Sequence, residues 1–192
     1  MKKALLASYE KDEALLRLAK LLTKNNWTLL GSSGTAKYLN ENGISCRDAA
    51  EIVGKSILSH RVVTLSREIH AALLAATPED YQELKSLDIE VIDLVYVTLY
   101  PLEKMIADPA TTSANVIEKT DIGGPTLLRS AAKGRRLALS DPSQIDELKK
   151  WLDAGSPESA REALVLRFAA AAERRVADYV DASARYWESK VT

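Results

Sequence analysis

Along this chain, short continuous apolar runs typical of buried strands alternate with segments in which apolar residues recur at helical spacing. Residues 3–8 form a short apolar run, typical of a strand buried on both faces. Apolar residues then recur on one helical face, which predicts a helix over 12–25. A strand at 27–31 and a helix at 36–42 follow, with Gly43 where a helix commonly ends in a left-handed residue. This order indicates an α/β domain with a mainly parallel sheet.

The rest of the chain continues the alternation and ends in helix. Thr77 and Pro78 suit the N-cap and first position of a helix. The stretch 90–99 is the most hydrophobic and predicts the central strand. The other predicted elements are a short apolar run at 62–65, helices at 69–76, 78–87, 123–133 and 141–154, a strand at 137–140, and one or two long helices from 156. We expect a single domain over 1–192.

Composition narrows the class of protein. The chain has 192 residues, 46% hydrophobic, with a formal net charge of −1, which excludes a disordered chain and gives no general reason to expect a nucleic-acid or membrane partner. Apolar runs fall short of the roughly 20 residues of a membrane span, so we expect a cytoplasmic domain. One cysteine, Cys46, and two histidines give little support for a metal centre or a serine–histidine triad.

A loop of small residues is the first candidate site. Ser32, Ser33, Gly34 and Thr35 stand between a predicted strand and a predicted helix. Amides at a helix N-terminus, with hydroxyls and a glycine, suit a phosphate group. The alternative, favoured for the loop alone, is that Ser33 or Thr35 only caps the helix.

Two further segments carry candidate residues. Asp121, followed by Gly123 and Gly124 at a helix start, suits a ligand donor or a plain turn. Tyr100 follows the long apolar strand, where open α/β sheets bind ligands, but an aromatic residue there also suits packing. A basic cluster follows them, formed by Arg129, Lys133, Arg135 and Arg136. Taken singly, these features indicate only a phosphate-binding α/β domain.

Together, five segments resemble one family. KALLASYEK, GSSGTAKYL, RVVTLSREIHAALLA, IDLVYVTLYPLEK and EKTDIGGPTLLRSAAK are similar, in order and spacing, to the inosine monophosphate (IMP) cyclohydrolase domain of the bifunctional enzyme that also carries a formyltransferase. The resemblance covers essentially all of the chain. It implies a methylglyoxal-synthase-like three-layer sandwich, with a mainly parallel sheet and a helical C-terminal end, and a chain without the formyltransferase domain.

The resemblance also implies a reaction and its residues. In that family a formamidoimidazole-carboxamide ribonucleotide closes its ring to IMP, with no metal or organic cofactor, in a homodimer. Matching positions assign Tyr100, Asp121 and Lys133 to catalysis, and assign the binding of substrate and phosphate to Lys11, Ser32, Ser33, Gly34, Thr35, Arg61, Thr64, Gly123 and Gly124.

Some positions depart from the family pattern. Val63 stands where the family has a lysine beside the reacting groups, Ser66 replaces a histidine, and Ala7 and Tyr9 replace serines. Valine donates no hydrogen bond and moves no proton, and losing one donor near an oxyanion costs about 10²–10³ in rate. Two hypotheses follow: a cyclohydrolase acting on this purine-type ribonucleotide or a close analogue, and a catalytically reduced purine-nucleotide-binding module.

Overall fold

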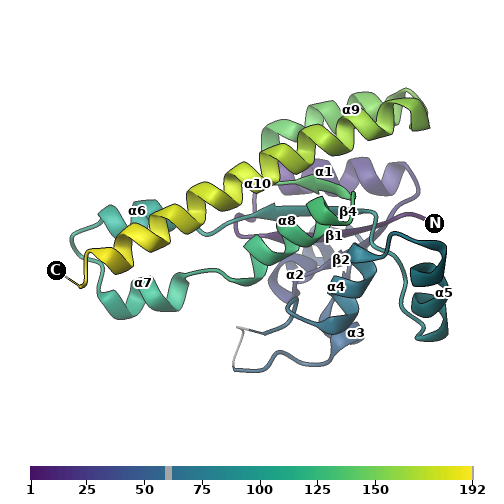
Figure 1. Cartoon of the computed structure of the whole chain (residues 1–192). Helices are drawn as coiled ribbons and strands as arrows, with labels where there is room; N and C mark the ends of the chain where they lie inside the picture. The colour runs from purple at the N-terminus through teal and green to yellow at the C-terminus, as the bar shows by residue number, and fades with distance from the viewer. Residues whose placement is uncertain (59–61, 192) are drawn as a thin grey trace.

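Five parallel strands form the sheet at the centre of the molecule (Figure 1). The computed structural model describes residues 1–58 and 62–191. The strand order is β3-β2-β1-β4-β5, with every pair parallel. The strands are β1 (Lys3–Ser8), β2 (Thr28–Gly31), β3 (Arg47–Asp48), β4 (Leu94–Thr98) and β5 (Leu137–Leu139).

Helices cover both faces of this sheet, which makes three layers. Helices α1, α2 and α9 pack on one face, and α4 and α8 on the other. The long α10 contributes to both. The helices are α1 (Glu13–Lys24), α2 (Ser33–Glu41), α3 (Ala50–Val53), α4 (Arg67–Leu74), α5 (Pro78–Ser86), α6 (Leu102–Ala107), α7 (Ser113–Lys119), α8 (Gly123–Lys133), α9 (Ile145–Asp153) and α10 (Glu158–Glu188), with a 3-10 turn η1 at Pro142–Gln144.

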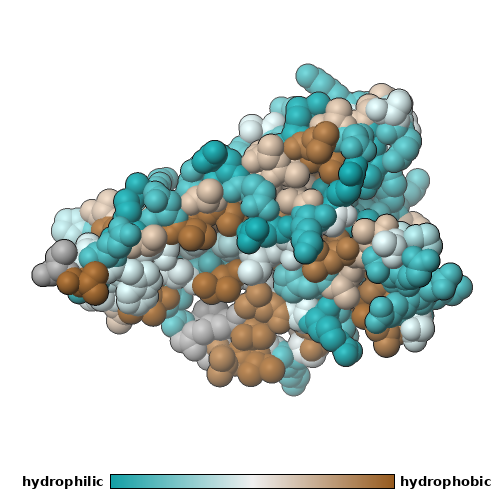
Figure 2. Space-filling model, viewed as in Figure 1, coloured by the Kyte–Doolittle hydropathy of each residue, from teal (hydrophilic) through white to brown (hydrophobic). Residues whose placement is uncertain are grey.

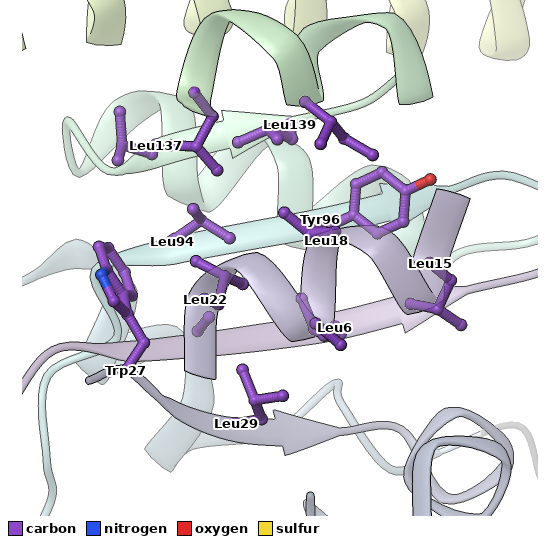
Figure 3. Packing of buried hydrophobic residues seen from close by; sticks show 14 of the residues in the cluster. Leu6, Leu15, Leu18, Leu22, Trp27, Leu29, Leu94, Tyr96, Leu137 and Leu139 are labelled. Carbon is purple, nitrogen blue, oxygen red and sulfur yellow. The ribbon is translucent and has the colours of Figure 1, made fainter. Parts of the chain in front are cut away.

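Alternation along the strands divides the core into two hydrophobic clusters. Leu6 of β1 and Tyr96 of β4 point to the face of α1, as Figure 3 shows. Leu5 and Val95, one position earlier, belong to the cluster on the opposite face. Because both faces of a strand are buried, its sequence reads as a continuous apolar run. This explains why β1 and β4 are recognisable in the sequence.

Helix α10 joins the two clusters. Phe168, in its first half, packs with α1 and α9, whereas Val176 and Tyr179 pack with α4 and α8. The helix lies against β5, and its last turns extend beyond the sheet beside α6 (Figure 1). The predicted helical C-terminal end is therefore one helix of 31 residues.

Local capping sets several helix boundaries as predicted. Thr77 caps α5 in a reciprocal capping box with Asp80, and Pro78 is its first residue. Gly43 has a φ of 74° after α2, the left-handed conformation that glycine adopts without steric cost. The predicted class, an α/β sandwich with a mainly parallel sheet, is confirmed.

The structure corrects three details of the predicted elements. The middle strand is β1, not the 90–99 stretch, which is strand only from Leu94 to Thr98; before it, the Ile92 N–H donates to Ala72 of α4. Val62 forms a single antiparallel bridge with Ile57 instead of starting a strand. The short β3, α3, α6 and α7 were not predicted.

Charged and apolar side chains are mixed over the face in Figure 2, and apolar ones gather over the segment after α3. Within that segment Ile57 and Leu58 are exposed. No helix in the described part of the chain is long and apolar enough to cross a membrane.

Candidate functional site

A cleft of about 960 Å³ opens at the carboxyl ends of β1 and β4. The chain proceeds from β1 to β2 and β3 on one side, and through β4 to β5 on the other, so the strand order reverses between β1 and β4. Open α/β sheets bind ligands at this switch point. The described lining residues are 7–9, 32–34, 56, 63–64, 98, 100, 117–124, 127, 183 and 187.

Hydrogen bonds between the two strand ends form the floor of the cleft. The hydroxyls of Ser8 and Thr98 lie 2.8 Å apart, and the Tyr9 N–H donates to the Thr98 hydroxyl (2.8 Å). The Ser8 hydroxyl also contacts the carbonyl oxygen of Glu10 (2.7 Å). These contacts fix the backbone from which Tyr9 and Tyr100 project.

The predicted phosphate loop is the first turn of α2, with Ser32 as its N-cap. Ser32 makes no side-chain capping hydrogen bond in the described structure; its hydroxyl donates to Thr35 Oγ1 (3.0 Å). Thr35 is fully buried and accepts from the Ser8 N–H (3.2 Å), while Ser33 donates to Asp48 (3.0 Å). The hydroxyls thus hold the loop in shape, and the predicted side-chain cap is wrong.

Backbone amides are the donors that this loop presents. The first intrahelical hydrogen bond runs from the Ala36 N–H to the Ser32 carbonyl (2.8 Å). The amides of Ser33, Gly34 and Thr35 precede it, where a helix has no internal acceptor for them. Since Ser33 and Gly34 are exposed in the cleft wall, this end of α2 suits an anionic group.

Lys11 lies beside this turn. Its side chain lies next to Gly34. If residue 34 had a Cβ, that atom would be 3.9 Å from Lys11 Cε, an ordinary van der Waals distance. Its ammonium donates to the carbonyl of Ser8, and burial lowers its pKa. Lys11 is therefore a cation adjoining the α2 amides, at the edge of the cleft.

Asp121 stands on the opposite wall, just before α8. Its Oδ1 accepts from the Gly124 N–H (3.0 Å), and its own N–H donates to the Tyr179 hydroxyl (2.7 Å) from α10. Burial raises the pKa of this carboxyl, although the amides of Gly124 and Gly123 favour its ionised form. The site thus holds a poorly hydrated carboxylate, fixed by the Gly124 N–H on a backbone that Tyr179 anchors.

Gly124 is required by close packing. A Cβ there would lie 2.4 Å from Asp121 Oδ2 and 2.6 Å from Leu99 Cδ2. A Cβ at Gly123 would stand 3.1 Å from the Thr64 hydroxyl. The two predicted glycines therefore let α8 begin directly against Asp121 and Thr64.

Tyr100 and Tyr9 form an aromatic pair in the cleft. Their ring centroids are 4.7 Å apart in an edge-to-face arrangement, and the Nζ of Lys119 lies 5.8 Å from the Tyr100 centroid. Burial and the neighbouring Tyr9 raise the pKa of Tyr100. The substitution at Tyr9 thus contributes an aromatic wall to the site.

The segment before α4 closes another side. Val63 and Thr64 line the cleft, whereas Ser66 accepts from the Ile69 N–H (3.2 Å) as the N-cap of α4. Arg61, a predicted nucleotide-binding residue, lies outside the described residues.

Three predicted site residues are not among the described lining residues: Lys11 and Thr35, which adjoin the first turn of α2, and Lys133, which lies far from it. Lys133 is exposed in the last turn of α8, and its ten-residue separation from Gly123 is about 15 Å of helix. Its neighbours in the basic cluster make structural contacts: Arg136 is buried and donates to the carbonyls of Leu73 and Ala75 at the end of α4.

Sequence reasoning missed the contributions of α7 and α10. Lys119 and Trp187 line the cleft, and Tyr179 binds the backbone of Asp121. Proximity to Asp121 in the sequence could have indicated Lys119. Nothing local distinguishes Tyr179 or Trp187 from other aromatic residues of an amphipathic helix.

The fold and the cleft define a class: a doubly wound parallel α/β domain with a candidate ligand cleft at its switch point, lined by a helix N-terminus that suits an anion and by the partly buried carboxyl of Asp121. In the described residues, no group of three or more histidine, cysteine, aspartate and glutamate side chains is arranged to hold a metal ion.

Comparison with known proteins identifies the family. Residues 14–126, more than half of the chain, match the family described as MGS-like domain, and the chain belongs to this family. It is similar to the bifunctional purine biosynthesis protein PurH of Oenococcus oeni, with 40% identity over 190 residues. PurH of Ligilactobacillus salivarius is 38% identical over 194 residues. These matches cover 94% and 96% of this chain, but only 37% and 38% of the two relatives.

A solved structure shares nearly the whole fold. The crystal structure of ForH matches with a TM-score of 0.81 and 30% sequence identity, covering 95% of this chain and 96% of that chain. The likeness thus includes the long C-terminal helix, which lies beyond the residues matched by the family.

Proposed function

We propose that this chain closes the ring of a formamidoimidazole-carboxamide ribonucleotide, or a close analogue, to form a purine nucleotide. The observation that carries the proposal is the pairing, in one cleft, of the α2 amide turn with the carboxyl of Asp121 and the ring of Tyr100. Similarity to PurH supports a role in purine biosynthesis.

The cleft suggests how the substrate is held. The ribonucleotide phosphate binds the amides of Ser33, Gly34 and Thr35, with Lys11 beside it. The imidazole then extends toward Asp121 and Tyr100. Holding both reacting groups of one molecule in near-attack geometry contributes a large part of the rate of such a reaction.

Asp121 and Tyr100 move the protons. The carboxamide nitrogen forms a bond to the formyl carbon, whose carbonyl electron pair moves to oxygen, and Asp121 accepts the proton that the nitrogen releases. Tyr100 protonates the resulting oxyanion to a hydroxyl, and Asp121 returns its proton to that hydroxyl, which leaves as water. The former formamide nitrogen then gives its proton to the Tyr100 phenolate and forms the ring C=N bond. A poorly hydrated carboxylate is a stronger base than an exposed one, as this step requires.

Val63 favours a second function, a nucleotide-binding module with reduced catalysis. It presents an apolar side chain to the cleft where the resembling family has a lysine. If this alternative holds, Val63→Lys raises a near-zero rate of ring closure. If the chain acts on an altered substrate, the same change impairs the native reaction.

Ultraviolet absorbance of the formamidoimidazole-carboxamide ribonucleotide mixed with excess protein tests the proposal. We expect IMP to form with the wild type and not with Asp121→Ala. Binding of IMP without any ring closure would support the second function instead.

No cofactor takes part in the proposed step. The homodimer and the part of Lys133 remain predictions from the resemblance.

A further inference from the structure

Lys119 is the basic residue among the described lining residues of the cleft. It is the last residue of α7, and Thr120 separates it from Asp121. The segment that joins α7 to α8 runs beside the C-terminal half of α10 (Figure 1), where the Tyr179 hydroxyl accepts from the Asp121 N–H. Lys119 therefore enters the cleft from a segment that is anchored two residues further on.

The ammonium of Lys119 lies on the reaction side of the cleft. Its Nζ is 5.8 Å from the centroid of Tyr100, which packs against Tyr9. The α2 amides stand on a different element and already have Lys11 at their side. A phosphate thus has its donors elsewhere, while Lys119 accompanies Tyr100 and Asp121.

We propose that Lys119 is the cation that stabilises the oxyanion formed during ring closure, an inference that rests on the proposed function. As the carboxamide nitrogen attacks the formyl carbon, negative charge develops on the formyl oxygen. Asp121 takes the proton from nitrogen, and Lys119 donates a charge-assisted hydrogen bond to that oxygen until it leaves as water. Val63, also in the cleft, has no donor to offer it.

This role separates catalysis from product binding. The formyl oxygen is lost as water, so IMP lacks the atom that Lys119 contacts. Replacing the ammonium should slow ring closure without weakening the binding of IMP. A lysine that bound the phosphate or the ribose would instead affect substrate and product alike.

The experiment compares three variants by ring-closure kinetics and by calorimetric titration with IMP. Lys119→Met removes the charge and keeps an unbranched side chain, and Lys119→Arg keeps the charge. Lys190→Met is the matched control, because Lys190 also lies over a tyrosine ring, 5.0 Å from the centroid of Tyr186, but does not line the cleft.

We expect Lys119→Met to lower kcat by about 10²–10³ with an unchanged Kd for IMP, Lys119→Arg to retain part of the rate, and Lys190→Met to behave as the wild type. An unchanged kcat in Lys119→Met would overturn the role of Lys119 and leave the proposed function standing. A Kd for IMP that rises with the loss of rate would assign the ammonium to ligand binding instead. A wild type that closes no ring would overturn the proposed function, and this role with it.

Discussion

At the scale of single residues, Asp121 shows how function and stability oppose each other. Burial raises the pKa of its carboxyl, so the fold favours the protonated form. A group whose pKa is higher in the folded than in the unfolded state stabilises the fold below its unfolded pKa. That contribution is lost as pH rises through the folded pKa. At neutral pH the ionised Asp121 therefore lowers the free energy of unfolding.

Asp121→Asn should accordingly remove activity without removing stability. The amide oxygen still accepts from the Gly124 N–H, while the charge that burial penalises is gone. We expect ring closure to be abolished and the free energy of unfolding in urea at neutral pH to be equal to or higher than that of the wild type. A clear fall in stability would mean that the ionised carboxylate is favoured by the fold.

The same pKa shift predicts the pH dependence of the reaction. If ionised Asp121 is the base, the rate falls as pH decreases through its raised pKa. The acid limb of kcat/KM should then lie above about 3.9, the ordinary aspartate value. Steady-state rates with circular dichroism at each pH would separate titration from unfolding. An acid limb at or below the ordinary value contradicts this assignment.

At the scale of elements, Arg136 connects the loop between α8 and β5 with the C-terminal end of α4. Its buried guanidinium donates to the carbonyls of Leu73 and Ala75, the C-terminal end of α4, where a helix lacks internal donors and carries partial negative charge. Arg129, by contrast, pairs with Glu173 on the surface between α8 and α10. Arginines that are close in the sequence therefore make different contacts: Arg136 a buried bond to backbone carbonyls, and Arg129 an exposed ion pair.

Arg136→Met should destabilise the fold far more than Arg129→Met. The first leaves carbonyls at a buried helix end unpaired, at a cost of about 1.5–3 kcal/mol for bonds to a charged group. The second removes an exposed ion pair worth about 0–1 kcal/mol. Urea denaturation of both variants gives the comparison, and equal losses would show that the α4 end is solvated without Arg136.

The sequence was most informative where periodicity reflects burial. β1, β4 and α1 were predictable because their apolar spacing follows from the faces they bury. β3 has only two residues, and α6 and α7 are short, so they carry too little periodic signal. The residue pattern indicated the α2 turn, Asp121 and Tyr100 as candidates, and the resemblance assigned them roles. The α7 and α10 side chains reach the cleft by tertiary packing, as Tyr179 does across 58 residues, which spacing does not reveal.

At the scale of the whole molecule, Cys46 reports on the integrity of the fold. It is 5% exposed in the cluster that α1 and α2 form on the sheet, and burial, with the charge of Asp48, raises the pKa of its thiol to about 12. A thiol reacts as the thiolate, so a buried and protonated one is inert.

We expect Cys46 to react with a disulfide reagent at mildly alkaline pH only when the fold opens. The rate should rise with urea in parallel with the loss of circular dichroism. The chain has one cysteine, so the signal comes from one site. Rapid reaction in the absence of urea would show that the part of the core around α2 opens independently.

The two borders of the sheet have a consequence for the behaviour of the protein at high concentration. β3 pairs through only two residues, and β5 lies against α10, which packs on both sides of the sheet. A long, exposed edge strand can pair with other chains through its free backbone groups and so promote aggregation. In this fold the edge strand β3 is too short to pair stably with another chain, and the edge strand β5 lies next to a helix of 31 residues. A parallel sheet rich in leucine and valine can thus remain dispersed without relying on a large net charge.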